Sequence, residues 1–161
     1  MKSRIFLCLI VASLSLGLII TATPLFAQEK PADNMKILLE KVIADRKLLV
    51  ATNMKLTESE AKAFWPIYES YLKDLAKIRE HSFDVIHEFA KNYDNMSNET
   101  AKKIVDDYLA TQADHVKLLQ SYLPKLRQAL PEKKVVRFYQ IENKIEAVIN
   151  YELATDIPLI E

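Results

Sequence analysis

Apolar residues recur every three or four positions along most of this chain, which is the spacing that places them on one face of an α-helix. The pattern is interrupted at three points and predicts four helices, over residues 34–53, 57–92, 97–129 and from 131 to just before Ile157. We expect a single all-α domain over residues 34–155, followed by a C-terminal tail at 156–161. Its two long, kinked antiparallel helices would form a bundle or a bent helical hairpin.

Local signals mark where two of these helices begin. Thr57 and Glu60 have the spacing of a capping box, in which each side chain accepts a hydrogen bond from the backbone N–H of the other residue. Ser97 precedes the next apolar run and is suited to cap the helix that carries it. The turn between the two long helices is expected at residues 93–95.

Prolines mark further changes of direction. Pro66 and Pro124 fall inside predicted helices and should bend them, or in the case of Pro124 break the helix, because proline removes a backbone donor and crowds the preceding turn. Pro131 suits the first turn of the last helix, where a missing N–H costs nothing. Pro158 predicts that this helix ends before Ile157, since a residue ahead of proline avoids helical geometry.

The first 27 residues have the layout of a secretory signal peptide. A basic start precedes an uncharged apolar run at 5–20, and small residues follow near Ala27. We therefore predict cleavage between Ala27 and Gln28, a flexible leader at 28–33, and export to the periplasm without stable membrane insertion afterwards. An uncleaved membrane anchor is the alternative, because residues 5–27 carry no charge and are long enough to span a bilayer.

Cleavage would remove the only glycine, Gly17, and the only cysteine, Cys8. Without glycine, no segment of the mature chain is expected to need positive φ, and Gly-rich phosphate loops are excluded. Without cysteine, disulfides, thiol catalysis and cysteine-ligated zinc are excluded too. A serine nucleophile would need a strained turn of the kind that glycines build. We therefore expect a protein that is not an enzyme and uses no cofactor.

The charge balance bears on partners. The whole chain has 22 basic and 22 acidic residues. Loss of Lys2 and Arg4 with the signal peptide leaves 20 against 22, a formal charge of −2. Nucleic-acid binding usually requires a basic face, so nucleic acid is not an expected partner.

Three side chains form a weak candidate for a metal site. His81, Asp84 and His87 follow one another at intervals of three and therefore share one helix face. A di-iron bundle would need the carboxylate-x-x-histidine pattern on two helices, and His115 has Gln112 three residues before it. Polar decoration of a helix surface is the favoured interpretation, and a loose zinc or copper site is the alternative.

Aromatic residues supply the candidate client-binding surface. Phe64 and Trp65 are adjacent and point about 100° apart on a helix, so both cannot face one narrow seam. Most aromatics at helical spacing belong to a core, but exposed ones suit an adaptable apolar contact surface. The candidates for such a surface are Trp65, Tyr68, Phe138 and Tyr139.

Two short segments carry a family resemblance. The segment Leu56–Glu60 resembles the Leu-Thr-x-x-Gln signature of the Spy/CpxP-like periplasmic proteins, with Glu60 in place of Gln, and Met96–Thr100 resembles a second copy. The segments Phe64–Tyr68 and Arg137–Glu142 are more similar to a group of uncharacterised exported bacterial proteins. The resemblance implies a bent helical hairpin that dimerises into a cradle and binds unfolded clients without ATP.

Together these features predict a periplasmic, ATP-independent, chaperone-like or envelope-stress protein that binds unfolded or envelope proteins, with a homodimer as one arrangement. Two other functions stay open. One is a periplasmic metal-responsive sensor or adaptor. The other is a structural partner of a membrane complex.

Overall fold

The computed structural model describes residues 45–160, and every regular element within this range is helical. Residues 45–54 form an N-terminal helical segment, followed by α2 (Glu58–Asn92), the short 3₁₀ helix η1 (Tyr93–Asn95), α3 (Asn98–Ala129) and α4 (Glu132–Asp156). The all-α prediction is confirmed. The predicted signal peptide, its cleavage at Ala27–Gln28, the leader at 28–33 and positions 34–44 of the first predicted helix lie outside the described residues.

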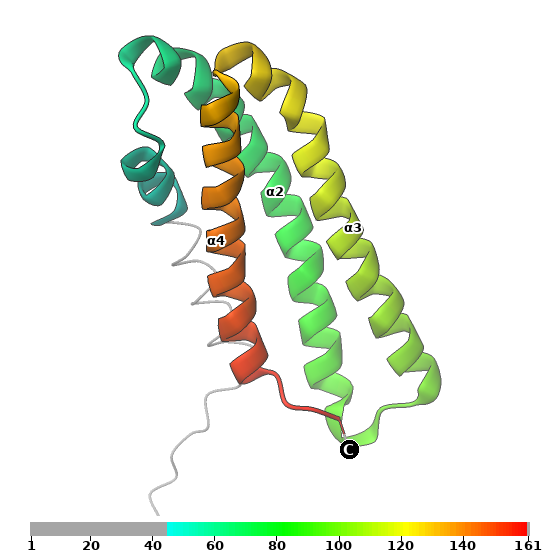
Figure 1. Ribbon diagram of the computed structural model, residues 1–161. Helices are drawn as coiled ribbons and strands as arrows, with labels where there is room; N and C mark the ends of the chain where they lie inside the picture. Colours follow the sequence, from blue (N-terminus) through cyan, green and yellow to red (C-terminus); the bar gives the residue numbers. More distant parts are fainter. Residues whose placement is uncertain (1–44, 161) are drawn as a thin grey trace, which may run out of the picture.

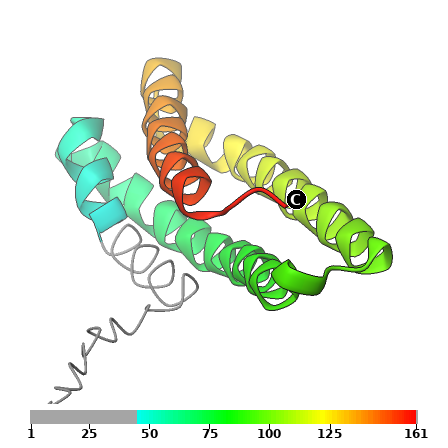
Figure 2. The same ribbon diagram turned by 90° about the horizontal axis from the view of Figure 1, so that it is seen from below.

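The two long helices form an antiparallel hairpin. Figure 1 shows α2 and α3 running side by side from the upper end of the molecule to the turn at η1. The last helix, α4, returns across this hairpin, and Figure 2 shows the N-terminal helical segment on the other side of α4 from α3. After Asp156 the chain crosses back towards the lower ends of α2 and α3, where the Tyr93 hydroxyl donates to the carbonyl oxygen of Leu159 at 2.8 Å.

The predicted caps are present at both long helices. The Thr57 hydroxyl accepts from the backbone N–H of Glu60 at 3.3 Å, and the Thr57 N–H donates to the Glu60 carboxylate at 2.8 Å. This reciprocal pair is a complete capping box. The Ser97 hydroxyl accepts from the N–H of Thr100 at 3.1 Å and caps α3. Both helices therefore begin where the sequence predicts.

The two prolines inside the long helices do not end them, whereas α4 ends at Asp156, before Ile157 and Pro158 as predicted. The helices α2 and α3 each continue through their internal proline, Pro66 and Pro124. Figure 1 shows the upper ends of both helices, which carry these residues, tilting away from the axes of the lower parts. Pro131 stands one position earlier than predicted, as the N-cap of α4 and not in its first turn.

One backbone position contradicts the sequence analysis. Lys55 has φ of 51°, in the left-handed region, so the prediction that no segment needs positive φ is wrong. The residue ends the N-terminal helical segment, where a left-handed residue commonly reverses the chain. Its neighbours show how a non-glycine residue is held there. The Lys134 ammonium donates to the Lys55 carbonyl, and Arg137 Nε donates to the Asn53 carbonyl at 2.5 Å. Two cations of α4 thus bind the free carbonyls of this helix end.

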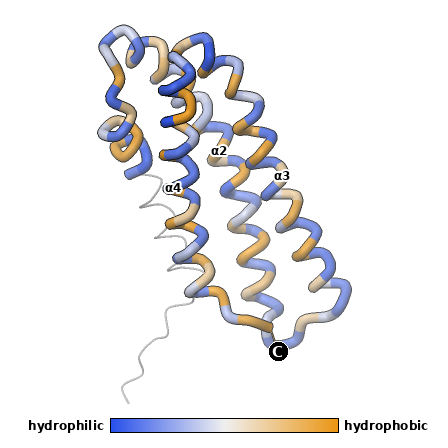
Figure 3. The backbone as a smooth tube through the Cα atoms, in the orientation of Figure 1, coloured by the Kyte–Doolittle hydropathy of each residue, from blue (hydrophilic) through white to orange (hydrophobic). Residues whose placement is uncertain are grey.

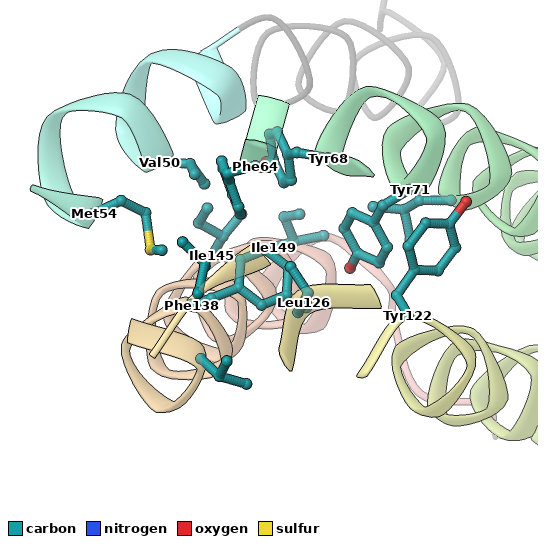
Figure 4. Close-up of a cluster of buried hydrophobic side chains, with 13 residues drawn as sticks. Val50, Met54, Phe64, Tyr68, Tyr71, Tyr122, Leu126, Phe138, Ile145 and Ile149 are labelled. Carbon is teal, nitrogen blue, oxygen red and sulfur yellow. The ribbon is translucent and has the colours of Figure 1, made fainter. Parts of the chain in front are cut away.

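The core lies where the four helical segments meet. Figure 3 shows apolar and polar residues alternating along each helix, as amphipathic helices require. Figure 4 shows the core side chains converging, with the aromatic rings at its centre. Phe64 and Tyr68 stack at 5.4 Å between ring centroids, and Phe138 meets Phe64 edge-on at 5.9 Å. The buried apolar residues are Val50, Met54, Phe64, Tyr68, Tyr71, Leu75, Tyr122, Leu126, Leu130, Val135, Phe138, Ile145 and Ile149. Among the described helices, none is both long and apolar enough to cross a membrane.

Candidate functional site

A groove runs between α3 and α4, and we call it the α3–α4 groove. It consists of three neighbouring cavities of about 600, 470 and 660 Å³, ordered from the α3–α4 junction towards the η1 end. The first two cavities share Val116, Leu119, Tyr139 and Asn143 in their walls, and the second and third share Arg79, Ser82, Thr111, Gln112 and Asn150. Because neighbouring cavities share walls, the three form one continuous depression.

The groove follows from how α4 joins the hairpin. Only Leu130 and Pro131 separate α3 from α4, so the two helices are held together at this end, where Leu126 and Val135 are buried. Figure 2 shows α4 leaving α3 towards the other end, with α2 beneath the opening. The chain after Asp156 then crosses this end, and its residues 157–160 line the third cavity.

Large apolar side chains stand exposed along the groove and its rim. Val105, Tyr108, Leu109 and Val116 of α3 are between 53% and 57% exposed, and Val136 of α4 is 55% exposed. All of them except Leu109 line one of the three cavities, and Leu109 lies one helical turn from Val105. Such a row on one helix differs from scattered surface apolar residues and is typical of surfaces at which proteins bind partners.

The middle of the groove is polar and has a charged floor. Arg79, Glu142, Glu146 and His115 line its central cavity. Glu146 accepts hydrogen bonds from Arg79 of α2 and from Arg46 of the N-terminal helical segment, the latter at 2.9 Å. Arg46 also donates to Glu142. We call these five residues the ionic cluster. Two arginines and two glutamates balance in charge, so the cluster is neutral when His115 is neutral.

Tyrosines complete the hydrogen bonding of Glu142. The Tyr71 hydroxyl donates to one carboxylate oxygen at 2.8 Å, and the Tyr68 hydroxyl approaches the other at 3.3 Å. Arg46 and Glu142 are only 1% and 2% exposed, so this carboxylate and its partners lie inside the protein. Burial raises the pKa of both tyrosines, and the negative charge of Glu142 raises it further, so both stay protonated donors.

Burial and charge move the other ionisable groups of the cluster in opposite directions. Burial lowers the pKa of His115 below its ordinary 6.5; the Glu146 carboxylate opposes this shift, and the Arg79 and Arg46 charges reinforce it. Burial alone would raise the pKa of Glu146, but Arg79 and Arg46 outweigh it and hold that pKa below its usual value. Burial alone would lower the pKa of Arg46, but its interactions, above all with Glu142, outweigh burial and raise that pKa. His115 Nε2 is 3.9 Å from the Glu146 carboxylate and has no hydrogen-bond partner among residues 45–160.

The four aromatic candidates from the sequence do not form one surface. Tyr68 and Phe138 are fully buried core residues, so neither side chain is on the surface of this structure, where the sequence analysis expected a client to contact it. Their rings fill the space where the helices meet, and only the Tyr68 hydroxyl has a polar role. Trp65 is half-buried on α2, with its ring edge-on to Phe64 at 5.2 Å and the Lys47 ammonium 5.6 Å from its centroid. It lines none of the three cavities of the groove.

Tyr139 is the one candidate that lies in the groove. It is half-buried, lines the first two cavities, and donates its hydroxyl to the Leu119 carbonyl at 2.6 Å. This bond joins α4 to α3 near their junction. Its ring therefore forms part of the wall of the groove.

The metal candidates lie elsewhere. His81, Asp84 and His87 are exposed on α2, and His87 lies against the Phe83 ring at 6.4 Å between centroids. His81 and Asp84 line a further cavity of about 370 Å³ between α2 and α3, which shares Val85, Ile104 and Thr111 with the third cavity of the groove. Within residues 45–160, no group of three or more His, Cys, Asp or Glu side chains is arranged to hold a metal ion.

Sequence reasoning missed the ionic cluster, although one signal was visible. Glu142 occupies a position in the apolar stripe of the last helix, between Phe138 and Ile145. Arg46 likewise interrupts the apolar spacing ahead of Val50. A charge on a core-facing stripe requires a buried partner of opposite charge. The sequence alone does not say which of its many opposite charges that partner is.

Comparisons with models of protein families, with curated proteins and with solved structures find no match for this chain. Functional inference therefore rests on the groove and the residues that line it.

Proposed function

We propose that this protein binds other polypeptides in the α3–α4 groove, as an ATP-independent, chaperone-like or envelope-stress protein of the periplasm. The observation that carries the proposal is the row of exposed apolar side chains along α3 beside a continuous groove. The signal-like N-terminus supports the compartment.

The size of the groove favours a polypeptide over a small molecule. Its three cavities extend along most of α3 and are open to solvent, whereas sites for small ligands are usually single concave pockets that enclose most of the ligand. Covering the exposed Val105, Tyr108 and Val116 removes apolar surface from water, which contributes about 25 cal/mol for each Å² covered. No nucleotide is needed for such binding, because apolar burial supplies the free energy.

The ionic cluster at the floor of the groove also supports the proposed function. A protein that offers apolar surface to unfolded clients must itself stay folded while the surface is open. Arg46, Glu142 and Glu146 tie the N-terminal helical segment to α4 and keep the floor of the groove rigid. Arg79 ties α2 to α4 at the same place.

Light scattering from a chemically unfolded client tests the proposal. Equimolar protein should suppress client aggregation in buffer without nucleotide. The variant Tyr108→Ser removes an exposed aromatic ring from the groove and should weaken suppression severalfold while leaving the helical circular dichroism unchanged.

Tyr151→Ser is the matched control. Tyr151 is a tyrosine of α4 that is 68% exposed and lines none of the three cavities, so its replacement should leave suppression intact. Equal effects of the two variants would place client binding outside the groove. Unchanged scattering at every ratio of wild-type protein would refute the proposed function.

A further inference from the structure

The exposed side of α3 has the residue spacing of a coiled-coil seam. Starting from Val105, the positions along the groove and its rim are separated by four, three, four, three and four residues, and they are Val105, Leu109, Gln112, Val116, Leu119 and Leu123. This alternation places residues on the narrow stripe that receives the knobs of a second helix. We call these six residues the α3 seam.

Only part of the α3 seam has a partner in this chain. Leu119 and Leu123 are half-buried near the α3–α4 junction, where Tyr139 and Val135 line the same cavity. Val105, Leu109 and Val116 are more than half exposed, because α4 does not cover them. The seam is therefore partly covered at its Leu119–Leu123 end and exposed to solvent over the rest of its length.

The lining of the groove changes in character along its length. The junction end has Val136 and Leu123, and the η1 end has Phe89, Leu153 and Ile157. Between them the central cavity is lined by the exposed carboxamides of Gln112, Asn143 and Asn150 and by four less exposed side chains of the ionic cluster. A ligand that fills the groove meets apolar walls at both ends and hydrogen-bonding amides in the middle.

We infer that the α3–α4 groove binds an amphipathic α-helix of a partner protein, with apolar residues towards both ends of its docking face and one polar, hydrogen-bonding residue at the centre. This inference rests on the proposed function and specifies the form of the polypeptide. From Val105 to Leu123 the seam covers 18 positions, or about 27 Å at the rise of an α-helix, so the docked helix has about five turns.

A helix fits these observations better than an extended chain. The helices of this bundle have no free sheet edge within the described range, so an extended segment would find no continuous row of backbone partners, only the three amides and water, for its own N–H and C=O groups. A helix satisfies its backbone internally and needs only side-chain contacts from the groove. The walls supply these at the spacing of the α3 seam.

Two labelled 18-residue peptides of identical composition test the inference. In the first, leucines follow the 3-4 spacing with one asparagine at the centre of that face; in the second, the same residues alternate with period two. Fluorescence anisotropy should show at least tenfold tighter binding of the first, with a gain of helical circular dichroism in the complex. Equal affinity for both peptides, or no binding of the first, would overturn the inference.

Exchange of the central polar residue gives a second readout. Gln112→Leu should weaken binding of the asparagine peptide at least threefold and strengthen binding of a version with leucine at the centre. Gln128→Leu, an exposed glutamine of α3 outside the three cavities, is the matched control and should change neither. The same loss for both peptides in the Gln112 variant would contradict a polar match at the centre.

The outcomes separate the two proposals. If client aggregation is suppressed while neither peptide binds, polypeptide binding stands and the helical form is wrong. If suppression also fails, the proposed function fails with it. Sedimentation velocity gives a third result: a dimer that Val105→Ser dissociates would show that a second copy of this chain, and not a partner helix, occupies the groove.

Discussion

Arg46 and Glu142 form a buried ion pair that joins the N-terminal helical segment to α4 across 96 positions of the sequence. Both side chains are almost completely removed from water, and Tyr68 and Tyr71 add their hydroxyls to the same carboxylate. Removing one partner of such a pair leaves an uncompensated buried charge, which is far more costly than never burying the pair.

The first prediction follows from this asymmetry. Arg46→Met should lower the free energy of unfolding by about 3–5 kcal/mol, because it leaves the buried Glu142 carboxylate without its main cation. The double variant Arg46→Met/Glu142→Gln removes the stranded charge. Its amide oxygen still accepts from one tyrosine hydroxyl and its NH₂ donates to the other, so the variant should recover about 2 kcal/mol. Urea denaturation followed by circular dichroism measures both. Equal destabilisation of the single and double variants would show that the charge itself is unimportant.

The second prediction concerns the capping box of α2. Thr57→Ala removes the hydroxyl that accepts from the Glu60 N–H, and it should lower the free energy of unfolding by about 1 kcal/mol. Thr52→Ala, at an exposed threonine inside the N-terminal helical segment, is the control and should change stability much less. A shift in the urea midpoint for Thr57→Ala no larger than for the control would mean that the cap contributes nothing.

The third prediction concerns pH. The folded protein holds the pKa of His115 below its ordinary 6.5, so the unfolded chain takes up this proton first as the pH falls. The free energy of unfolding should therefore decrease as the pH is lowered from about 6.5 towards the folded pKa. Above about 6.5 this contribution is constant, because His115 is neutral in both states.

Thermal unfolding between pH 5 and 8 measures the effect. The variant His115→Gln should have a flatter profile over this range. The charged groups that face His115 are Arg46, Arg79, Glu142 and Glu146. Glu146 acts at lower pH: its pKa is held below the usual value, so its contribution is lost only as the pH falls through that folded pKa. An identical slope for wild type and variant would rule out His115 as the origin.

The fourth prediction separates stability from binding at Trp65, the only tryptophan of the chain. Its ring packs against Phe64 and Tyr68 and is half-buried, so Trp65→Ala should cost about 2–3 kcal/mol, less than the ~3–5 kcal/mol of a fully buried tryptophan. Client suppression by the folded variant should be unchanged, because Trp65 lies outside the α3–α4 groove. Weaker suppression of client aggregation at unchanged stability would show that the client-binding surface includes Trp65.

Much of the secondary structure was predictable from local sequence. The caps at Thr57 and Ser97, the turn at residues 93–95 and the end of α4 before Ile157 all depend on contacts between residues a few positions apart. Such short-range chemistry is the same in any helical fold, so it can be recognised without knowing which helices pack together. The all-α class follows from the same periodicity.

Tertiary packing decided which apolar residues are core and which are surface. Tyr68 and Tyr108 occupy similar places relative to their caps, yet Tyr68 is buried and Tyr108 is half exposed. The difference arises because Tyr68 packs against Phe138 and bonds to Glu142 of α4, whereas α4 has diverged from α3 beside Tyr108. Neither residue differs locally in a way that would reveal this.

The sequence by itself determined where α2 and α3 begin and where α4 ends, because caps and apolar spacing act over one or two turns. Only the tertiary structure decided the pairing of Arg46 with Glu142, the left-handed conformation of Lys55 and the opening of the α3–α4 groove. Each of these depends on groups far apart in the chain. The buried charge of Glu142 is paired with the cation that the fold places next to it. The carbonyls at and before Lys55 bind cations from α4. The groove exists because two helices joined at one end diverge at the other. Long-range packing sets all three, and local propensity carries no information about it.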